Sequence, residues 1–233
     1  MPISYIGAGS AVQTVTTTLT IAGHASSLPN DIHIAHIISI NNTAISAPDS
    51  TWNEISQANF TGSRGAIFWK RITAAGAGSY AFTVGGTTTS YGIVTCHRGC
   101  KLNGRPYGTS TTSSNASADA ITYATLVPHS SNGSMIAVGF YAEDETTGGT
   151  VDGSNYTFAA PSVDVEQATN EDASIFVSIA PMTTNVATGA LSQATTSTVD
   201  AVNQGVLFDL IAVESEVGGG GSGVKYPRIT RIR

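Results

Sequence analysis

The segment DIHIAHIISI, residues 31–40, decides the fold class of this chain. Its isoleucines recur with the two-residue period of a β-strand, and His36 falls among them. The isoleucines on this face are Ile32, Ile34, Ile38 and Ile40. Similar short segments, separated by loops of Thr, Gly, Ser and Asn, are found at 15–21, 64–73, 80–84, 91–96, 120–126, 134–143, 155–159, 174–180 and 205–215. The pattern predicts an all-β protein, and we expect a single antiparallel, jelly-roll-like β-sandwich of about ten strands.

Two of these segments differ from the rest because they are almost continuously apolar. Residues 134–142 and 174–180 contain few polar side chains. A strand that is buried on both faces shows such a run, so we expect both segments in the middle of sheets. Residues 51–60 fit a turn of helix, a strand or a loop equally well.

Composition supports the same fold class. The chain has 233 residues, of which 41% are hydrophobic and only 11% are charged. Disordered chains have the opposite balance, and this length is enough for a core of substantial size. Thr, Val, Ile, Ser and Gly suit strands and tight turns. We expect one β-sandwich domain over 1–216, a Gly/Ser linker over 217–223 and a basic C-terminal arm over 224–233.

Charge is distributed unevenly along the chain. The net charge is -6, but the last ten residues carry +4 and residues 1–223 carry a formal -10. An acidic body repels the phosphate backbone, so we do not expect nucleic acid as a partner. No apolar run is long enough to span a membrane, and the first residues lack the pattern of a signal peptide, so we expect folding in a cytosol.

The arm is the strongest candidate for a binding segment. Extended, its ten residues reach about 33 Å, and the linker adds about 20 Å, which is enough to cross onto a neighbouring molecule. In a homo-oligomer its arginines would pair with carboxylates of the next copy, while its isoleucines anchor it. The alternative is a loose C-terminus or an expression scar. The candidate partner-binding residues are Lys225, Tyr226, Pro227, Arg228, Ile229, Arg231, Ile232 and Arg233.

Cysteine and histidine offer weak signals for a metal site or a disulfide. Cys96 and Cys100 would lie about 13 Å apart on an extended strand, beyond the roughly 7 Å that a disulfide allows, unless the chain turns between them. We favour two free, buried thiols. His33 and His36 lie three residues apart on a predicted strand, so they point to opposite faces and cannot share a metal without a bulge. We expect no metal and no cofactor.

The sequence also lacks the motifs of common enzymes. It contains no nucleophile elbow, no zinc-protease motif and no phosphate-binding loop. Carboxylates are grouped in pairs or triplets, which we interpret as solvated loops rather than as calcium or glycosidase sites. These groups are Glu143, Asp144 and Glu145, then Asp164 with Glu166, and Glu171 with Asp172. We therefore predict a protein that is not an enzyme and has no catalytic residues.

Aromatic residues suggest one alternative function. Most of them fall within apolar strands, where packing in the core explains them. Tyr107 instead lies in a loop-like segment, NGRPYGTSTTSS, so we expect it to be exposed and able to stack on a ligand. A carbohydrate-binding or adhesin module, with a host-surface glycan as partner, is therefore the alternative to a purely structural protein.

The order of several features resembles β-sandwich structural proteins of tailed bacteriophages. The matching positions lie within residues 28–180 and are Asp31, Trp52, Trp69-Lys70 and His97-Arg98-Gly99. No catalytic residue transfers from this resemblance, and the two cysteines depart from its pattern. It implies a virion protein, assembled in the host cytoplasm, that decorates or cements the capsid or a tail component. The expected partners are further copies of the chain and the major capsid or tail proteins.

Overall fold

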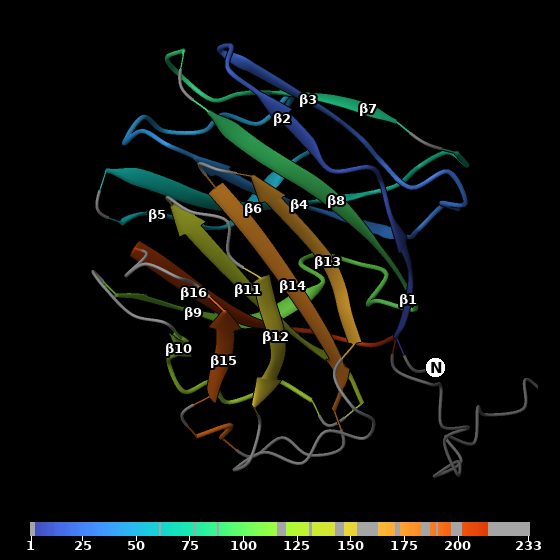
Figure 1. Cartoon of the computed structure of the whole chain (residues 1–233). Coiled ribbons are helices and arrows are strands. Elements are labelled where there is room, and N and C mark those ends of the chain that lie inside the picture. The colour runs from blue at the N-terminus through green and yellow to red at the C-terminus, as the bar shows by residue number, and fades with distance from the viewer. Residues whose placement is uncertain are drawn as a thin grey trace, which may run out of the picture.

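The structure is a computed structural model, and its strands stack in four antiparallel layers (Figure 1). It describes residues 3–60, 62–76, 78–87, 89–115, 120–130, 132–142, 147–152, 163–170, 173–182, 187–189, 191–196 and 202–213. The described residues form sixteen strands, which confirms the all-β class. The described part of the chain contains no helix that could cross a membrane.

The first half of the chain forms a six-stranded sheet with a two-stranded layer above it. In the large sheet β4 lies between β6 and β8, β6 also pairs with β5, and β8 also pairs with β1 and β2. The small layer is the pair β3–β7. The bounds are β1 Ser4–Ala8, β2 Val12–Thr14, β3 Thr18–Ala22, β4 Ile32–Ser39, β5 Asn53–Phe60, β6 Ser63–Arg71, β7 Ser79–Thr83 and β8 Ser90–Arg98.

The second half repeats this arrangement. In its five-stranded sheet β11 lies between β14 and β16, with β13 paired to β14 and β9 paired to β16. The outer layer has the order β10-β15-β12. The bounds are β9 Tyr107–Asn115, β10 Ala120–Tyr123, β11 Ser134–Ala142, β12 Thr147–Asp152, β13 Val163–Asn170, β14 Ala173–Pro181, β15 Leu191–Thr196 and β16 Val202–Leu210.

The two halves correspond strand by strand. Central strands β4 and β11 each have two neighbours that carry the edges of the sheet, β5 on β6 with β1 and β2 on β8 in the first half, and β13 on β14 with β9 on β16 in the second. The pair β3–β7 corresponds to β10–β15. The third strand of the second outer layer, β12, also has a counterpart in the first half. β12 pairs with β15, and at the corresponding place Ser46 forms an isolated antiparallel β-bridge with Thr83 of β7. The C-terminal ends of the two halves lie side by side, because Cys100 and Ala212 form an antiparallel β-bridge. Its two backbone hydrogen bonds, each of 2.8 Å, join residues 99 and 101 to residues 213 and 211. The chain is therefore a tandem of two similar β-units.

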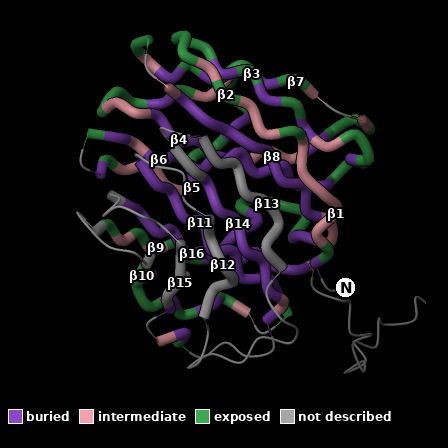
Figure 2. Tube along the Cα trace, viewed as in Figure 1, coloured by how far each residue is buried: buried purple, intermediate pink, exposed green. Residues whose placement is uncertain are grey.

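This architecture corrects the expectation of a single sandwich of about ten strands. Three apolar cores separate the four layers, and the central core lies between the two large sheets. Strands β4 and β11 are buried along their whole length, because each sheet is covered on both faces (Figure 2). Outer strands β3 and β7 alternate strictly between exposed and buried residues. The expectation that 134–142 and the described part of 174–180 lie inside sheets is confirmed.

The halves meet through close packing of the large sheets. Gly65 on β6 faces Phe140 on β11, and a Cβ at Gly65 would lie 2.6 Å from the phenyl ring and 2.4 Å from Oε1 of Gln204. A larger residue does not fit there unless the side chains of Phe140 and Gln204 move. Hydrogen bonds also cross the interface, such as Ser56 Oγ to Thr112 Oγ1 at 3.0 Å.

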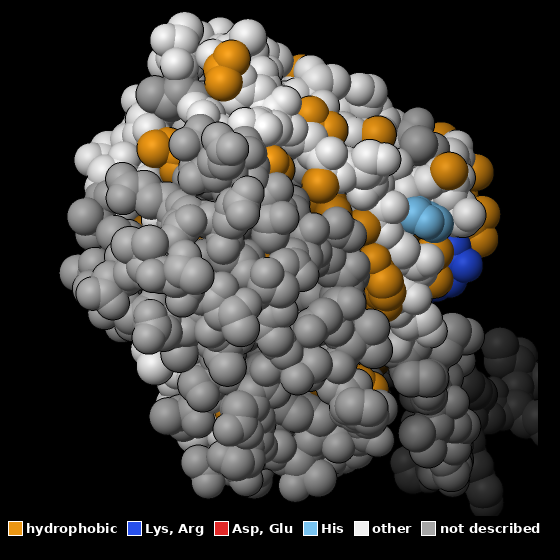
Figure 3. Space-filling view, in the orientation of Figure 1, with side chains coloured by type: hydrophobic (Ala, Val, Ile, Leu, Met, Phe, Trp, Pro, Cys, Tyr) orange, Lys and Arg blue, Asp and Glu red, His pale blue; other side chains and the backbone are white. Residues whose placement is uncertain are grey.

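The described surface on the side shown in Figure 3 is made mainly of hydrophobic and uncharged polar side chains. Lys or Arg atoms gather at one edge of this view, beside a histidine. This agrees with the low charged fraction of the sequence, 11%. Charged side chains are thus few, so a place where several of them gather is a candidate for a functional site.

Candidate functional site

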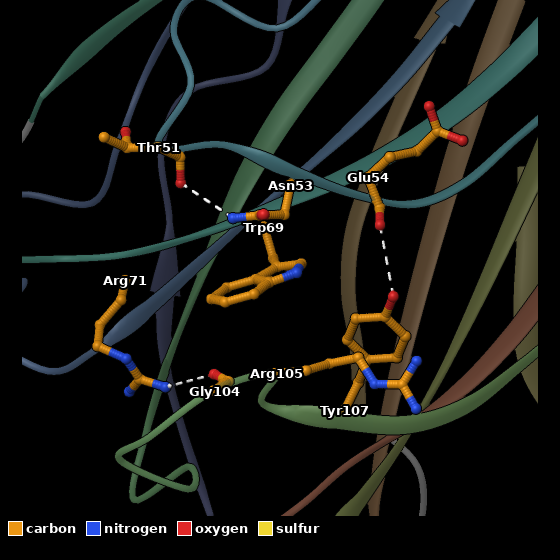
Figure 4. A pocket seen from close by; sticks show the side chains of 8 residues that line it. All are labelled: Thr51, Asn53, Glu54, Trp69, Arg71, Gly104, Arg105 and Tyr107. Carbon is orange, nitrogen blue, oxygen red and sulfur yellow. Dashed lines mark hydrogen bonds between the residues drawn. The ribbon is translucent and has the colours of Figure 1, made fainter.

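An open pocket of about 620 Å³ lies where the two halves meet, between the β5–β6 hairpin and the segment that connects β8 to β9 (Figure 4). Pockets of this size are in the range that binds small ligands. The residues that line it are Thr51, Asn53, Glu54, Trp69, Arg71, Gly104, Arg105 and Tyr107.

Strand pairing places the apolar part of the pocket. Asn53 on β5 is the cross-strand partner of Trp69 on β6, so both side chains share one face of the sheet. Trp69 is half-buried and packs against the end of the central core. Its indole lies in the middle of the pocket in Figure 4. Trp69 lies in the apolar segment 64–73, whose aromatic residues we expected in the core, and the structure gives it a second role as a pocket wall.

Arg71, two residues further along β6, fixes the connecting segment. One terminal nitrogen donates to the carbonyl oxygens of Lys101 at 2.6 Å and of Gly104 at 3.4 Å. The other donates to the carbonyl oxygen of Asn30 at 3.4 Å. Gly104 has a φ of 69°, a conformation that glycine adopts without strain. The turn and the arginine together shape one wall of the pocket.

Tyr107 is buried, with 8% exposed, contrary to the expectation of an exposed loop residue. It is the first residue of β9, and its hydroxyl donates to the carbonyl oxygen of Glu54 at 3.4 Å. The exposed guanidinium of Arg105 lies 4.7 Å from the centre of its ring and donates to the carbonyl oxygen of Gly108 at 2.7 Å. Tyr107 thus orients an arginine instead of meeting a ligand with an exposed face.

Basic residues that lack an acidic partner are concentrated here. Among the described residues the ion pairs are Arg98 with Asp31 at 2.7 Å and Lys70 with Asp49 at 3.6 Å. Arg71, Lys101 and Arg105 have no carboxylate partner in that part of the chain. The carboxylate of Glu54 accepts a hydrogen bond from Gln57 at 2.9 Å and points away from the pocket in Figure 4. With two arginines and one outward-directed carboxylate, the described lining of the pocket is therefore electropositive.

A second polar cluster is closed to ligands and surrounds His33. Tyr80 Oη lies 2.9 Å from Nδ1 of His33, whose Nε2 lies 2.5 Å from Oγ of Ser27. The Ser27 hydroxyl donates to the carbonyl oxygen of His24 at 2.6 Å, so it accepts from Nε2–H. To act as a general base, Nε2 of His33 would have to accept the serine proton and not donate one. Burial also lowers the pKa of His33 to about 4. The arrangement holds a loop and does not activate a nucleophile.

Asp31 ties this cluster to the end of β8. Its side chain, 3% exposed, accepts two hydrogen bonds from Arg98, at 2.9 and 2.7 Å, and one from the backbone N–H of Leu28 at 2.8 Å. Burial opposes the charged carboxylate, but these donors outweigh it and lower the pKa of Asp31. The Asp31 and Arg98 positions of the phage-like pattern thus meet in space as a structural ion pair.

Both cysteines are free and buried, as expected. Burial raises the pKa of Cys96 to about 11 and that of Cys100 to about 12, so neither forms an appreciable thiolate at neutral pH.

We predict that both thiols react with Ellman's reagent at pH 8 at least about 100-fold more slowly in the folded protein than in urea, because the thiolate fraction falls tenfold for each unit of pKa. The measurement is the time course of absorbance after mixing. Ser26→Cys, at an exposed position, serves as a fast-reacting control. Rapid modification of the native wild-type protein would contradict the burial of both thiols.

His36 and His97 lie in the central core, joined by the hydroxyl of Thr95. Each Nε2 lies 3.0 Å from Oγ1 of Thr95, and both Nδ1 atoms are buried without a hydrogen-bond partner. Burial lowers both pKa values to about 3. His33 faces the opposite side of β4, toward Tyr80, which confirms that His33 and His36 do not share a face. Within the described ranges no cluster of three or more potential metal ligands occurs.

The candidate arm residues, 225–233, and the linker, 217–223, lie outside the described residues. The same holds for the acidic groups 143–145 and 171–172, while Asp164 and Glu166 belong to β13. The pocket combines residues from 51–54, 69–71 and 104–107, which no sequence motif links. Protein-family models, curated proteins and solved structures were all compared with the chain, and none of them matches it.

Proposed function

We propose that this chain is a non-enzymatic structural protein of a tailed-phage virion, which decorates or cements the capsid or a tail component. The observation that carries the proposal is the separation of charge between the two halves. Residues 1–105 hold six basic and three acidic residues, a formal +3, whereas residues 106–223 hold thirteen acidic residues and no basic one, a formal -13. The arm adds +4 and gives the net -6.

Such a chain is electrostatically complementary to its own copies. The acidic second half attracts the basic arm and the basic end of the first half of a neighbouring molecule. These are different surfaces, so the contact is heterologous and builds rings or extended arrays. Virion layers are assemblies of this kind. The arm residues Lys225 to Arg233 would supply the clasp, and virion location and capsid or tail partners belong to the same proposal.

We also propose a jelly-roll-like fold for each half. In each half the first and last strands pair, and the last strand also pairs with the central one, as β1-β8-β4 and β9-β16-β11. If β1 and β2, which both pair with β8, count together as the first strand, then the second and the penultimate strands of each half form the opposite layer, as β3–β7 and β10–β15. This connectivity supports the assignment of one jelly-roll-like unit to each half.

Light scattering of the full chain and of a 1–217 truncation, at low and high salt, tests the structural role. We expect an oligomer that dissociates in salt and upon truncation, because the contact is electrostatic. A matched variant keeps the arm but replaces Lys225, Arg228, Arg231 and Arg233 by Gln, and we expect it to behave like the truncation. A full-length chain that stays monomeric at low salt, or a truncation that assembles normally, would refute the clasp.

A second candidate function, binding of a host-surface glycan, is favoured by the pocket between the halves. The half-buried indole of Trp69 lies beside the exposed polar side chains of Thr51 and Asn53. A flat apolar surface bordered by hydrogen-bonding groups suits a sugar ring, which presents C–H groups on its faces and hydroxyls at its edge. A receptor-binding virion protein would combine both functions.

A further inference from the structure

We propose that the pocket between the halves selects acidic saccharides, with a carboxylate on Arg105 and a sugar ring on Trp69. The inference rests on the second proposed function and adds to it the chemical class of the ligand. Uronic acids and sialic acids share this chemistry, since both carry a carboxylate on a sugar ring.

Arg105 is arranged to receive a carboxylate. One of its nitrogens donates to the carbonyl oxygen of Gly108, and its guanidinium stacks on the buried ring of Tyr107. No other residue of the described chain accepts a hydrogen bond from it, so the remaining N–H groups are free for a ligand. A guanidinium held in this way can bind a carboxylate through two parallel hydrogen bonds, and little side-chain entropy is lost on binding.

The surroundings of Arg105 favour an anion. Arg71 lines the pocket, and its three hydrogen bonds go to carbonyl oxygens, which leave its positive charge unneutralised. The one carboxylate in the described lining, that of Glu54, is exposed. It accepts a hydrogen bond from Gln57 and is directed away from the pocket. A carboxylate would be attracted by this positive charge, whereas a neutral ligand would not.

The rest of the pocket fits a ring rather than a bare anion. Trp69 provides an apolar surface near the centre, and Asn53 donates to the carbonyl oxygen of Thr51 at 3.2 Å, which holds its amide at the rim. The volume of about 620 Å³ exceeds what an inorganic ion fills. The basic arm is not a suitable occupant, because its +4 charge would meet Arg71 and Arg105.

Calorimetry with two acidic sugars and their neutral counterparts tests the inference. The probes are trigalacturonic acid with its methyl ester, and sialyllactose with lactose, each at concentrations up to about 10 mM. We expect at least one acidic sugar to bind the full-length protein about tenfold or more tightly than its neutral partner, because a hydrogen bond to a charged group contributes about 1.5–3 kcal/mol. The preferred pair identifies the source of the carboxylate.

Three variants locate the binding site. Arg105→Gln should weaken the acidic sugar about tenfold and leave the neutral one unchanged, whereas Trp69→Leu should weaken both. Arg64→Gln is the matched control, since Arg64 lies at the other end of β6 and donates to Asn59 and Gln57. It should bind like wild type. Circular dichroism of each variant confirms that it is folded.

The outcomes separate the inference from the function on which it rests. Equal affinity for acidic and neutral sugars would overturn the selection of acids and leave glycan binding intact. Binding of neither would overturn both. Displacement of the sugar by inorganic phosphate at equal concentration, with no effect of Trp69→Leu, would show a general anion site and also overturn the inference.

Discussion

The protein should lose about 6 kcal/mol of its free energy of unfolding between pH 7.5 and pH 5. Three histidines are responsible, because burial lowers the pKa of His33 to about 4 and those of His36 and His97 to about 3. In the unfolded chain each returns to an ordinary value near 6.5. The unfolded state therefore binds more protons than the folded state throughout the interval between these values.

The sign and the pH window follow from this difference. Where the unfolded state binds more protons, stability rises with pH, so the full stability is present above about pH 6.5 and is lost as pH falls. Each histidine contributes about 1.4 kcal/mol per pH unit, or about 2 kcal/mol at pH 5. The loss levels off below pH 3, where the folded state is protonated too. A loss of about 6 kcal/mol approaches the whole stability of many domains.

Urea unfolding followed between pH 7.5 and pH 5 measures this loss. His97→Gln should reduce the slope of stability against pH by about one third, whatever it does to stability at pH 7.5, since one titrating group is gone. A stability that stays constant over this range would show that these three side chains are not buried as neutral imidazoles.

Side-chain periodicity predicted much of the fold correctly because burial depends on it directly. The alternation in 31–40 places Ile34 and His36 toward the central core and His33 toward the outer layer, as the two-residue period requires. The run at 134–142 is continuous because β11 packs between two layers. Residues 51–60, for which the sequence left three options, contain strand β5.

Strand β9 escaped prediction because its sequence, YGTSTTSSN, resembles a loop. Its hydroxyls replace apolar contacts: Thr109, Thr111 and Ser113 donate to carbonyl oxygens of residues 127, 124 and 122. Such hydrogen bonds between a strand and the layer next to it depend on tertiary structure. Hydrophobic periodicity therefore cannot reveal them, and the strand count was too low.

The pocket and the tandem arrangement could not be predicted from the sequence, because both also depend on tertiary structure. The two halves share strand order but no sequence period that would reveal a repeat. The pocket forms only when the connecting segment folds back on β6, where Arg71 holds it. Tyr107 was the pocket residue that the sequence singled out as a ligand contact, and its predicted exposure was wrong because β9 begins there and buries it.

Replacing Phe140 by Ala should lower the free energy of unfolding by about 3–5 kcal/mol. Phe140 is fully buried in the central core, and its ring faces Gly65 of the other half. Gly65 has no side chain that could move into the space that the ring leaves. The cavity therefore opens at the interface between the halves.

The same variant asks whether the halves unfold together. Both tryptophans, Trp52 and Trp69, belong to the first half, so their fluorescence reports on that half, while far-ultraviolet circular dichroism reports on all strands. We expect the two signals to give one common urea midpoint in wild type and a lower common midpoint in Phe140→Ala, because the central core links the large sheets.

Phe176→Ala is the matched control, because Phe176 is similarly buried but packs in the outer core of the second half, 5.6 Å from the ring of Tyr141. Phe176 does not contact either tryptophan region of the first half. If the halves are one cooperative unit, Phe176→Ala must nevertheless shift the urea midpoint measured by tryptophan fluorescence. A fluorescence midpoint unchanged by Phe176→Ala would mean that the first half unfolds independently. A loss below about 1 kcal/mol in Phe140→Ala would mean that the large sheets do not pack through this ring.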